Sequence, residues 1–125
     1  LRNDLIREID AEIKNQMRIT SLNSQEQFYS ESPGMIIDRL SILYIKHSVV
    51  KNLLMVIEES GLKKEYSEKE KIIKEQISRL GNFLDLYFNK LKNKEVFFEV
   101  QEPIKIYNDE RIKRYIKLAK QNKRI

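Results

Sequence analysis

The sequence lacks cysteine and tryptophan and has only 3 glycines and 2 prolines. Without cysteine, the chain has no disulfide bond, no thiol nucleophile and no cysteine-based zinc site. No apolar run reaches the roughly 18 residues that a membrane-spanning helix needs. The scarcity of glycine and proline, together with abundant Ile, Leu, Lys and Glu, favours long helices. We therefore expect an all-α protein.

The length of 125 residues predicts a single helical domain over residues 1–125, large enough to bury a core. No stretch has the pattern of a secretory signal peptide. Together with the lack of cysteine, this favours a bacterial cytoplasmic protein. Because the chain begins at Leu1 and not at Met, we expect that an N-terminal segment of the domain precedes it.

The formal net charge of +5 is unevenly distributed. Residues 110–125 contain seven basic residues and one acidic residue, whereas the rest of the chain is nearly neutral. The sequence thus predicts a basic C-terminal helix over 110–125. Such a helix could bind nucleic acid or an anionic membrane. We favour a solvated helix end instead, because Tyr115 is the one aromatic residue in the segment.

Apolar residues recur every three or four positions in three segments, as they do in amphipathic helices. The first segment is 3–19, and a Ser-, Asn- and Gln-rich loop follows over 20–31. The last of the three begins at Ser67, where Glu70 three residues later predicts a capping box. The spacing is typical of antiparallel helical bundles.

The middle segment, 33–60, has the clearest start signal. Ser32 is a good N-cap, Pro33 suits the first helical position, and Gly61 suits the residue after the last turn. This helix is apolar around most of its circumference, so we expect it to be central and covered by neighbours. Since one small domain has few helices to cover it, we also predict self-association into a homo-oligomer.

The pattern changes after Asn93. Apolar and polar residues alternate near 96–107, which predicts a short extended segment or hairpin before the last helix. The expected fold is therefore an antiparallel helical bundle of three long helices with a short extended segment or hairpin near the C-terminus.

Several segments together resemble the motifs of a known family. Residues 32–34 read Ser-Pro-Gly, and Ile-Asp-Arg-Leu-Ser-Ile-Leu follows at 37–43, with Lys46 beyond it. The second motif consists of Lys105, Tyr107, Asn108 and Asp109. Residues 1–5, which read Leu-Arg-Asn-Asp-Leu, are similar to the helix that precedes both motifs. The family is the bacterial domain-of-unknown-function family numbered forty-two fifty-four.

The resemblance implies a small helical protein whose gene lies among glycosyltransferase and surface-polysaccharide genes. It implies no established activity. Members of the family also carry an upstream helix with a tryptophan and an acidic pair, which this chain lacks. A position where members tend to have histidine holds Val49 here, so the resemblance assigns no role to a histidine.

Asp38, Arg39 and Lys46 lie within the apolar arcs of the middle helix, where charges need a partner. Arg39 and Lys46 are seven residues apart and point the same way, about 10 Å apart along the axis. Together with the free N–H groups of the helix N-terminus, they could hold a phosphate or the pyrophosphate of a nucleotide sugar. The alternative is a structural ion-pair network, such as Asp38 with Lys105 or Arg39 with Asp109.

Lys105, Tyr107, Asn108 and Asp109 also have two interpretations. In one, Tyr107 stacks on a ring while Asn108 and Asp109 bind hydroxyl groups of a ligand. In the other, which we favour, Asn108 and Asp109 form a turn and a helix N-cap. In both interpretations we expect the segment to fold back over the start of the middle helix.

The sequence predicts no metal site and no cofactor. His47 is the only histidine and falls in the apolar stripe, so we expect a hydrogen-bonded histidine in or beside the core. A carboxylate-bridged di-iron bundle needs Glu-x-x-His pairs, and Tyr44 stands where the glutamate should be. The sequence also lacks a Walker A loop, His-Glu-x-x-His and Gly-x-Ser-x-Gly.

These features favour a non-enzymatic binding or accessory module in surface-polysaccharide synthesis. It would bind either an anion at this site, such as phosphate or a nucleotide sugar, or a glycosyltransferase as its protein partner. Two alternatives stay open. One is a glycan-modifying enzyme that uses Asp38 or Asp109 as an acid or base, and the other is a purely structural scaffold.

Overall fold

The computed structural model describes residues 2–19, 27–102, 104, 106 and 108–121. Within these ranges the chain forms helices and two very short strands. In chain order they are α1 (Arg2–Gln16), β1 (Gln27–Phe28), α2 (Pro33–Val56), α3 (Ser60–Lys92), β2 (Val96–Phe97) and α4 (Lys113–Gln121). The predicted all-α class is confirmed.

The start of α2 is confirmed and its end is not. Ser32 is the N-cap, with its Oγ accepting a hydrogen bond from the Met35 backbone N at 3.3 Å. Pro33 occupies the first position, where no N–H is needed. The helix ends at Val56, and Ile57 is extended. The predicted end at Ser60, with Gly61 closing the helix, is therefore wrong.

The third long helix begins earlier than predicted. α3 starts at Ser60, so Gly61 lies in its first turn, and Ser67 and Glu70 lie inside the helix instead of forming a capping box. Leu, Lys and Glu, which are strong helix formers, fill the stretch after Gly61 and extend the helix back to the turn at 57–59. With 33 residues, α3 is about 50 Å long.

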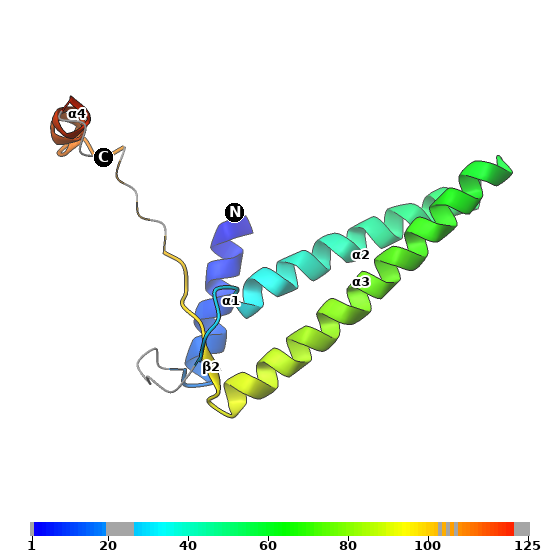
Figure 1. The fold of residues 1–125 in the computed structure, drawn as a ribbon, viewed down its shortest axis with the longest axis horizontal. Helices are drawn as coiled ribbons and strands as arrows, with labels where there is room; N and C mark the ends of the chain where they lie inside the picture. Colours follow the sequence, from blue (N-terminus) through cyan, green and yellow to red (C-terminus); the bar gives the residue numbers. More distant parts are fainter. Residues whose placement is uncertain (1, 20–26, 103, 105, 107, 122–125) are drawn as a thin grey trace.

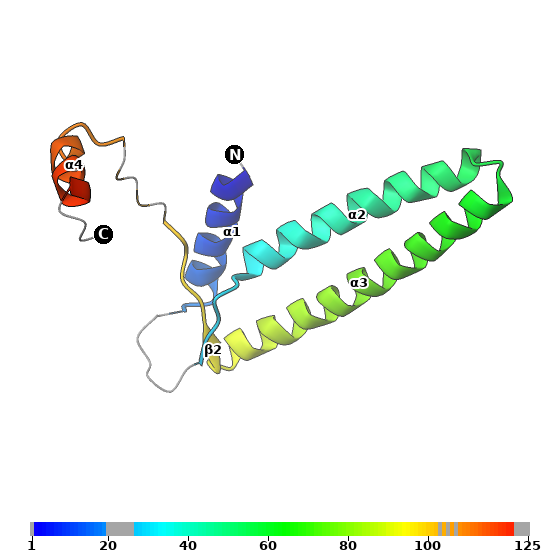
Figure 2. The same ribbon diagram turned by 45° about the horizontal axis from the view of Figure 1, so that its top comes forward.

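α2 and α3 form a long antiparallel hairpin (Figures 1 and 2). Near the end of α3, the Tyr87 hydroxyl donates to the carbonyl oxygen of Glu31, just before α2, at 2.6 Å. Midway, the Nε2 of His47 on α2 lies 3.4 Å from an oxygen of Glu70 on α3. α1 meets only the start of α2 (Figure 1), so the bundle is two helices thick over most of its length.

The core lies at the base of this hairpin, where α1, the start of α2, the end of α3 and β2 meet. Its largest fully buried side chains include Tyr87, Phe98, Ile36, Leu91 and Asp10. The Tyr87 ring packs edge-on against Tyr29 and Phe98, with centroids 5.0 and 6.4 Å away. Burial raises the pKa of Tyr87, so its hydroxyl stays protonated and keeps donating to Glu31.

The extended segment near 96–107 is confirmed at its start, but the predicted hairpin alternative is wrong. β2 pairs in parallel with β1, which lies in the predicted loop 20–31. Val96 and Phe98 are buried in the core at 2% and 0% exposure, and this alternate burial holds the chain extended. Phe97 faces the other way and packs against Phe28, with ring centroids 5.4 Å apart.

α2 is not covered on most sides, contrary to the prediction of a central helix. The exposed fractions of Ile45, Val49 and Val56 are 63%, 51% and 71%. α3 covers one face of α2, whereas α1 crosses α2 steeply near its start and does not run along it (Figure 2). Self-association stays a prediction.

α4 lies apart from the hairpin in both views (Figures 1 and 2), and no other described helix or strand packs against it. It covers 113–121, whereas 110–112 form a turn and 122–125 lie outside the described residues. Its basic and apolar side chains point in opposite directions. No helix in the described ranges is long and apolar enough to cross a membrane. Binding of a polyanion by this basic segment stays a prediction.

Truncating a core side chain of α3 at the base should destabilise the protein far more than truncating an exposed side chain of the same helix. Leu91 is 0% exposed and Leu86 is 51% exposed, and both lie on α3. Leu91→Ala should lower the free energy of unfolding by about 2–5 kcal/mol, whereas Leu86→Ala should cost well under ~1 kcal/mol. Urea unfolding followed by circular dichroism measures both, and equal losses would contradict the placement of the core.

Candidate functional site

A buried carboxylate joins α1 to the start of α2. Asp10 of α1 is 2% exposed. One oxygen of its carboxylate accepts a hydrogen bond from the backbone N of Gly34 at 2.7 Å, and the Ser32 hydroxyl is its second partner. Ser32 Oγ also accepts a hydrogen bond from Met35 N. The Ser32 hydroxyl and the backbone N–H groups of Gly34 and Met35 therefore all have partners within the chain. Sequence reasoning missed Asp10, because a lone aspartate in an amphipathic helix carries no signal of burial.

Burial raises the pKa of Asp10, and the hydrogen bonds from Ser32 and Gly34 oppose that shift. The N-terminus of α2 adds positive potential that favours a negative charge at the same place. This arrangement makes the predicted use of the helix N-terminus for an external anion wrong at two N–H groups. The N–H groups of Gly34 and Met35 were expected to be available for an external anion, but their acceptors are Asp10 and Ser32.

Gly34 makes this contact possible. A Cβ atom at position 34 would lie 2.6 Å from the Asp10 carboxylate oxygen and 2.9 Å from the Ile6 carbonyl oxygen. No side chain fits in that space, so α1 can approach α2 this closely only where α2 has a glycine. The Ser-Pro-Gly sequence thus serves three purposes: a cap, a first helical residue without N–H, and a site for close approach.

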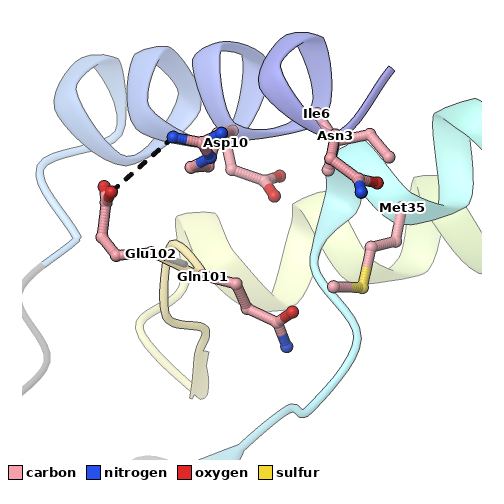
Figure 3. A pocket seen from close by; sticks show the side chains of 7 residues that line it. Asn3, Ile6, Asp10, Met35, Gln101 and Glu102 are labelled. Atoms are coloured by element: carbon pink, nitrogen blue, oxygen red, sulfur yellow. Dashed lines mark ion pairs between the residues drawn. The ribbon is translucent and has the colours of Figure 1, made fainter. Parts of the chain in front are cut away.

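A cavity of about 300 Å³ lies beside this junction. It is lined by Asn3, Ile6, Arg7, Asp10, Met35, Gln101 and Glu102. In Figure 3 the Asp10 carboxylate points from α1 toward Met35, and Glu102 pairs with an arginine of α1. That arginine, Arg7, lies 3.8 Å from Glu102 and also pairs with Asp4. The one cation of the lining, Arg7, is thus already engaged by two carboxylates.

The three charged residues predicted on α2 do not form one site. Asp38 pairs with Arg2 of α1, with the Arg2 Nε 2.6 Å from a carboxylate oxygen, and this bond lowers the pKa of Asp38. Arg39 pairs with Glu31 just before the helix. The proposed pairing of Arg39 with Asp109 is therefore wrong, since Asp109 pairs with Arg111. The proposed pairing of Asp38 with Lys105 stays untested. Lys105 lies outside the described residues.

Arg39 and Lys46 do meet, in a groove between α2 and α3 with a volume of about 540 Å³. Its lining comprises Arg39, Ile42, Leu43 and Lys46 from α2, and Gln76, Arg79, Leu80 and Phe83 from α3. We call this the anion groove. Among the described residues, three cations and no acid line it, over an apolar floor that includes Phe83. Arg79 and Phe83 were missed, although their spacing with Gln76 and Leu80 places all four on one face of a helix.

The cations of the anion groove are largely available. Arg79 lies 3.8 Å from Glu75 and the two side chains are 78% and 53% exposed, so that pair is weak. The Arg39–Glu31 pair is also half exposed. Lys46 has no hydrogen bond or ion pair within the described ranges. A ligand with negative charge would therefore compete only with solvated, weakly held partners.

The C-terminal candidates lie elsewhere. Asp109 accepts hydrogen bonds from the backbone N and Nε of Arg111, both at 3.0 Å, and this contact lowers its pKa. Asn108 and Asp109 form the turn before α4, far from α2 (Figure 1), so the expected fold-back over α2 is wrong for them. Gln101 lines the same cavity as Met35 at the start of α2. Lys105 and Tyr107 lie outside the described residues.

His47 lies between α2 and α3 with 20% of its side chain exposed. Its Nε2 is close to Glu70 at 3.4 Å, but the geometry is not that of a hydrogen bond, and Nε2 has no such bond within the described residues. His47 is thus partly buried between the two helices and not part of the core cluster at the base, and its buried Nε2 lacks the hydrogen bond expected of a core histidine. In the part of the chain that the structure describes, no three His, Asp or Glu residues gather as a metal site requires.

Comparison with known proteins gives one match. A family model described as a protein of unknown function (DUF4254) matches residues 1–100, the family that the sequence motifs resemble. No curated protein and no solved structure matches this chain. The match includes the α1–α2 junction and the anion groove, and it stops before α4.

Adding a methyl group at Gly34 should disrupt the α1–α2 junction. Gly34→Ala places a Cβ against Asp10 and the Ile6 carbonyl and should lower the free energy of unfolding by about 1–3 kcal/mol. Gly81→Ala is the matched control, because nothing lies within 4 Å of a Cβ there. It should stabilise α3 by roughly 0.5–1 kcal/mol. Denaturant unfolding measures both, and a stabilised Gly34→Ala would contradict the close approach.

The pH dependence of stability should change when Asp10 is neutralised. Since the folded-state pKa of Asp10 is raised, its contribution is fully present below the unfolded pKa of about 4 and is lost as pH rises through the folded pKa. Asp10→Asn keeps an acceptor for Gly34 and removes that titration. Its stability relative to the wild type should therefore increase as pH rises from about 4 toward neutral.

Thermal unfolding of both proteins across this range measures the difference. Asp38 and Asp109 have lowered pKa values and act in the opposite direction, but they are common to both proteins and cancel. Asp10→Ala also removes the titration but loses the acceptor, so it should be about 1–3 kcal/mol less stable than Asp10→Asn at every pH. A relative stability of Asp10→Asn that falls as pH rises would show that the charged form is the favoured one.

Proposed function

We propose that this chain, which belongs to the DUF4254 family of proteins of unknown function, is a non-enzymatic binding module for a phosphate-bearing ligand. The ligand lies in the anion groove between α2 and α3. The observation that carries the proposal is the convergence of Arg39, Lys46 and Arg79 on one apolar groove without any acidic lining residue. A nucleotide sugar is the ligand class that fits these groups.

The chemistry of the lining supports each part of such a ligand. The two arginines present planar, forked donors that match phosphate oxygens, and Lys46 adds a compact charge. Phe83 is 39% exposed and offers a ring face to a base or a sugar. Gln76 supplies a neutral amide for hydroxyl groups. A groove with an apolar floor and a few convergent polar groups is typical of small-molecule sites.

The enzyme alternative has less support. A general acid needs a pKa near the working pH, yet arginine partners lower the pKa of both Asp38 and Asp109. Asp10 has a raised pKa and lines a cavity, but its hydrogen-bond partners, Ser32 and Gly34, belong to the start of α2. We therefore assign Asp10 to the structure and the anion groove to ligand binding.

The biological setting follows from the family resemblance. We propose that the module acts in surface-polysaccharide synthesis and delivers or presents its ligand to a glycosyltransferase. A cytoplasmic location fits the absence of cysteine. A specific glycosyltransferase recovered with the tagged protein, and lost when ligand-binding variants are used, would support this setting. Recovery of no such enzyme would count against it.

Removing one groove cation should weaken ligand binding without affecting the fold. Lys46→Gln or Arg79→Gln should lower the affinity for uridine diphosphate glucose about tenfold, as expected for the loss of one charge-assisted hydrogen bond. Lys51→Gln is the matched control, because Lys51 is an exposed cation of α2 that does not line the groove. Isothermal titration calorimetry at low salt measures the affinities. Equal effects of Lys46→Gln and Lys51→Gln, or no binding by the folded wild type, would remove the proposal.

A further inference from the structure

A second groove continues the anion groove toward the tip of the hairpin. It has a volume of about 610 Å³ and is predominantly apolar. Its lining comprises Ile45, Lys46, Val49, Val50, Leu53, Tyr66, Lys69, Ile72, Ile73 and Gln76. We call it the apolar trough. Lys46 and Gln76 line both the trough and the anion groove, so the two are continuous.

Both grooves lie on the same face of the hairpin. Their lining residues recur at intervals of three and four along α2, from Arg39 to Leu53, which places them on one side of that helix. The same holds on α3 from Phe83 back to Tyr66. From Arg39 to Leu53 the combined channel is about 20 Å long at 1.5 Å per residue.

The channel has a polar end and an apolar end. Arg39 and Arg79 lie at the end near the base of the hairpin, and Lys46 marks the boundary. Beyond it, Val49 and Ile72 are 51% and 53% exposed, although both face the trough. Positive charge is concentrated at one end, and the rest is mainly uncovered hydrocarbon with one further cation, Lys69. This pattern complements an anionic amphiphile.

We propose that the channel also binds a phosphorylated lipid, whose phosphate takes the place of the phosphates of a nucleotide sugar. The lipid phosphate lies among Arg39, Lys46 and Arg79, and the hydrocarbon chain extends along the apolar trough toward the tip. The inference rests on the proposed function for the phosphate site. It adds that a hydrocarbon chain is attached to the phosphate. Any sugar on the phosphate would lie toward Phe83, at the base end of the anion groove.

Charge argues against the other occupants of the trough. In an isologous contact with a second copy, the lysines of the trough, Lys46 and Lys69, would face the same patch of the partner, so like charges would be brought together. α4 carries basic residues and no acid, so docking α4 in the trough would also bring like charges together. A lipid phosphate has the opposite charge and brings hydrocarbon to the exposed apolar side chains.

A homologous series of alkyl phosphates tests the proposal directly. Octyl, decyl and dodecyl phosphate are titrated into the full chain below their micelle concentrations, beside the matching alkyl alcohols and inorganic phosphate. Full burial of a methylene strengthens binding about fourfold, and an open trough should give roughly twofold per methylene. The affinity should therefore rise steadily with chain length in the phosphate series and stay weak for the alcohols.

Variants at each end of the channel test the apolar trough and the phosphate site independently. Val49→Ser together with Ile72→Ser should abolish the dependence on chain length and leave the affinity for uridine diphosphate glucose unchanged. Met55→Ser is the matched control, because Met55 is 83% exposed on α2 and does not line the trough. Lys46→Gln should weaken binding of every phosphate about tenfold, whatever its chain length. Circular dichroism shows that each variant is folded.

The outcomes distinguish the lipid inference from the proposed function. Binding of phosphates with no effect of chain length overturns the lipid inference and leaves the anion groove intact. Equal binding of alcohols and phosphates also overturns it, because the trough then takes hydrocarbon alone. A dimer in sedimentation that Val49→Ser and Ile72→Ser dissociate, without lipid binding, assigns the trough to a second copy. If no phosphate binds to the folded protein, both proposals fail.

Discussion

The contact between the Asp10 carboxylate and the N-terminus of α2 is the constraint on which the rest of the structure depends. It fixes where α1 meets α2, because the Gly34 backbone N is 2.7 Å from that carboxylate and no side chain fits between the helices. A buried carboxylate without these donors would be costly. The same donors are the groups that an external phosphate at the helix N-terminus would have used, so this contact also decides where a ligand does not bind.

From that junction the packing becomes progressively thinner toward the tip. At the base, where α1, the start of α2, the end of α3 and β2 meet, the side chains of Tyr87, Leu91 and Phe98 are fully buried. Beyond the reach of α1, only α2 and α3 remain in contact, and a two-helix layer cannot bury apolar residues on its outer sides. The exposed Ile45, Val49 and Ile72 follow from this geometry. Stability therefore comes from the base, whereas the accessible surface for binding lies along the hairpin.

The distribution of charge reinforces this division. Most ionic side chains near the base have partners on neighbouring segments, such as Asp38 with Arg2 and Arg7 with Glu102. In the anion groove, by contrast, cations from two helices converge and acids are absent from the lining. Paired charges hold segments together, while an excess of one sign attracts a ligand of the other sign. The anion groove is where this excess coincides with an apolar floor, which is why we assign binding to it.

The sequence by itself determined the helical class, the Ser32–Pro33 start of α2 and the common direction of Arg39 and Lys46, because caps and the 3.6-residue period are local properties of the chain. It could not place the turn at 57–59, since helix-forming residues lie on both sides and the start signal at Ser67 was outweighed by them. Only the tertiary structure decided that Asp10 is buried, that β2 pairs with β1, and that Arg79 and Phe83 complete the anion groove. Each of these depends on segments distant in sequence meeting in space, and no local pattern records which of them will meet.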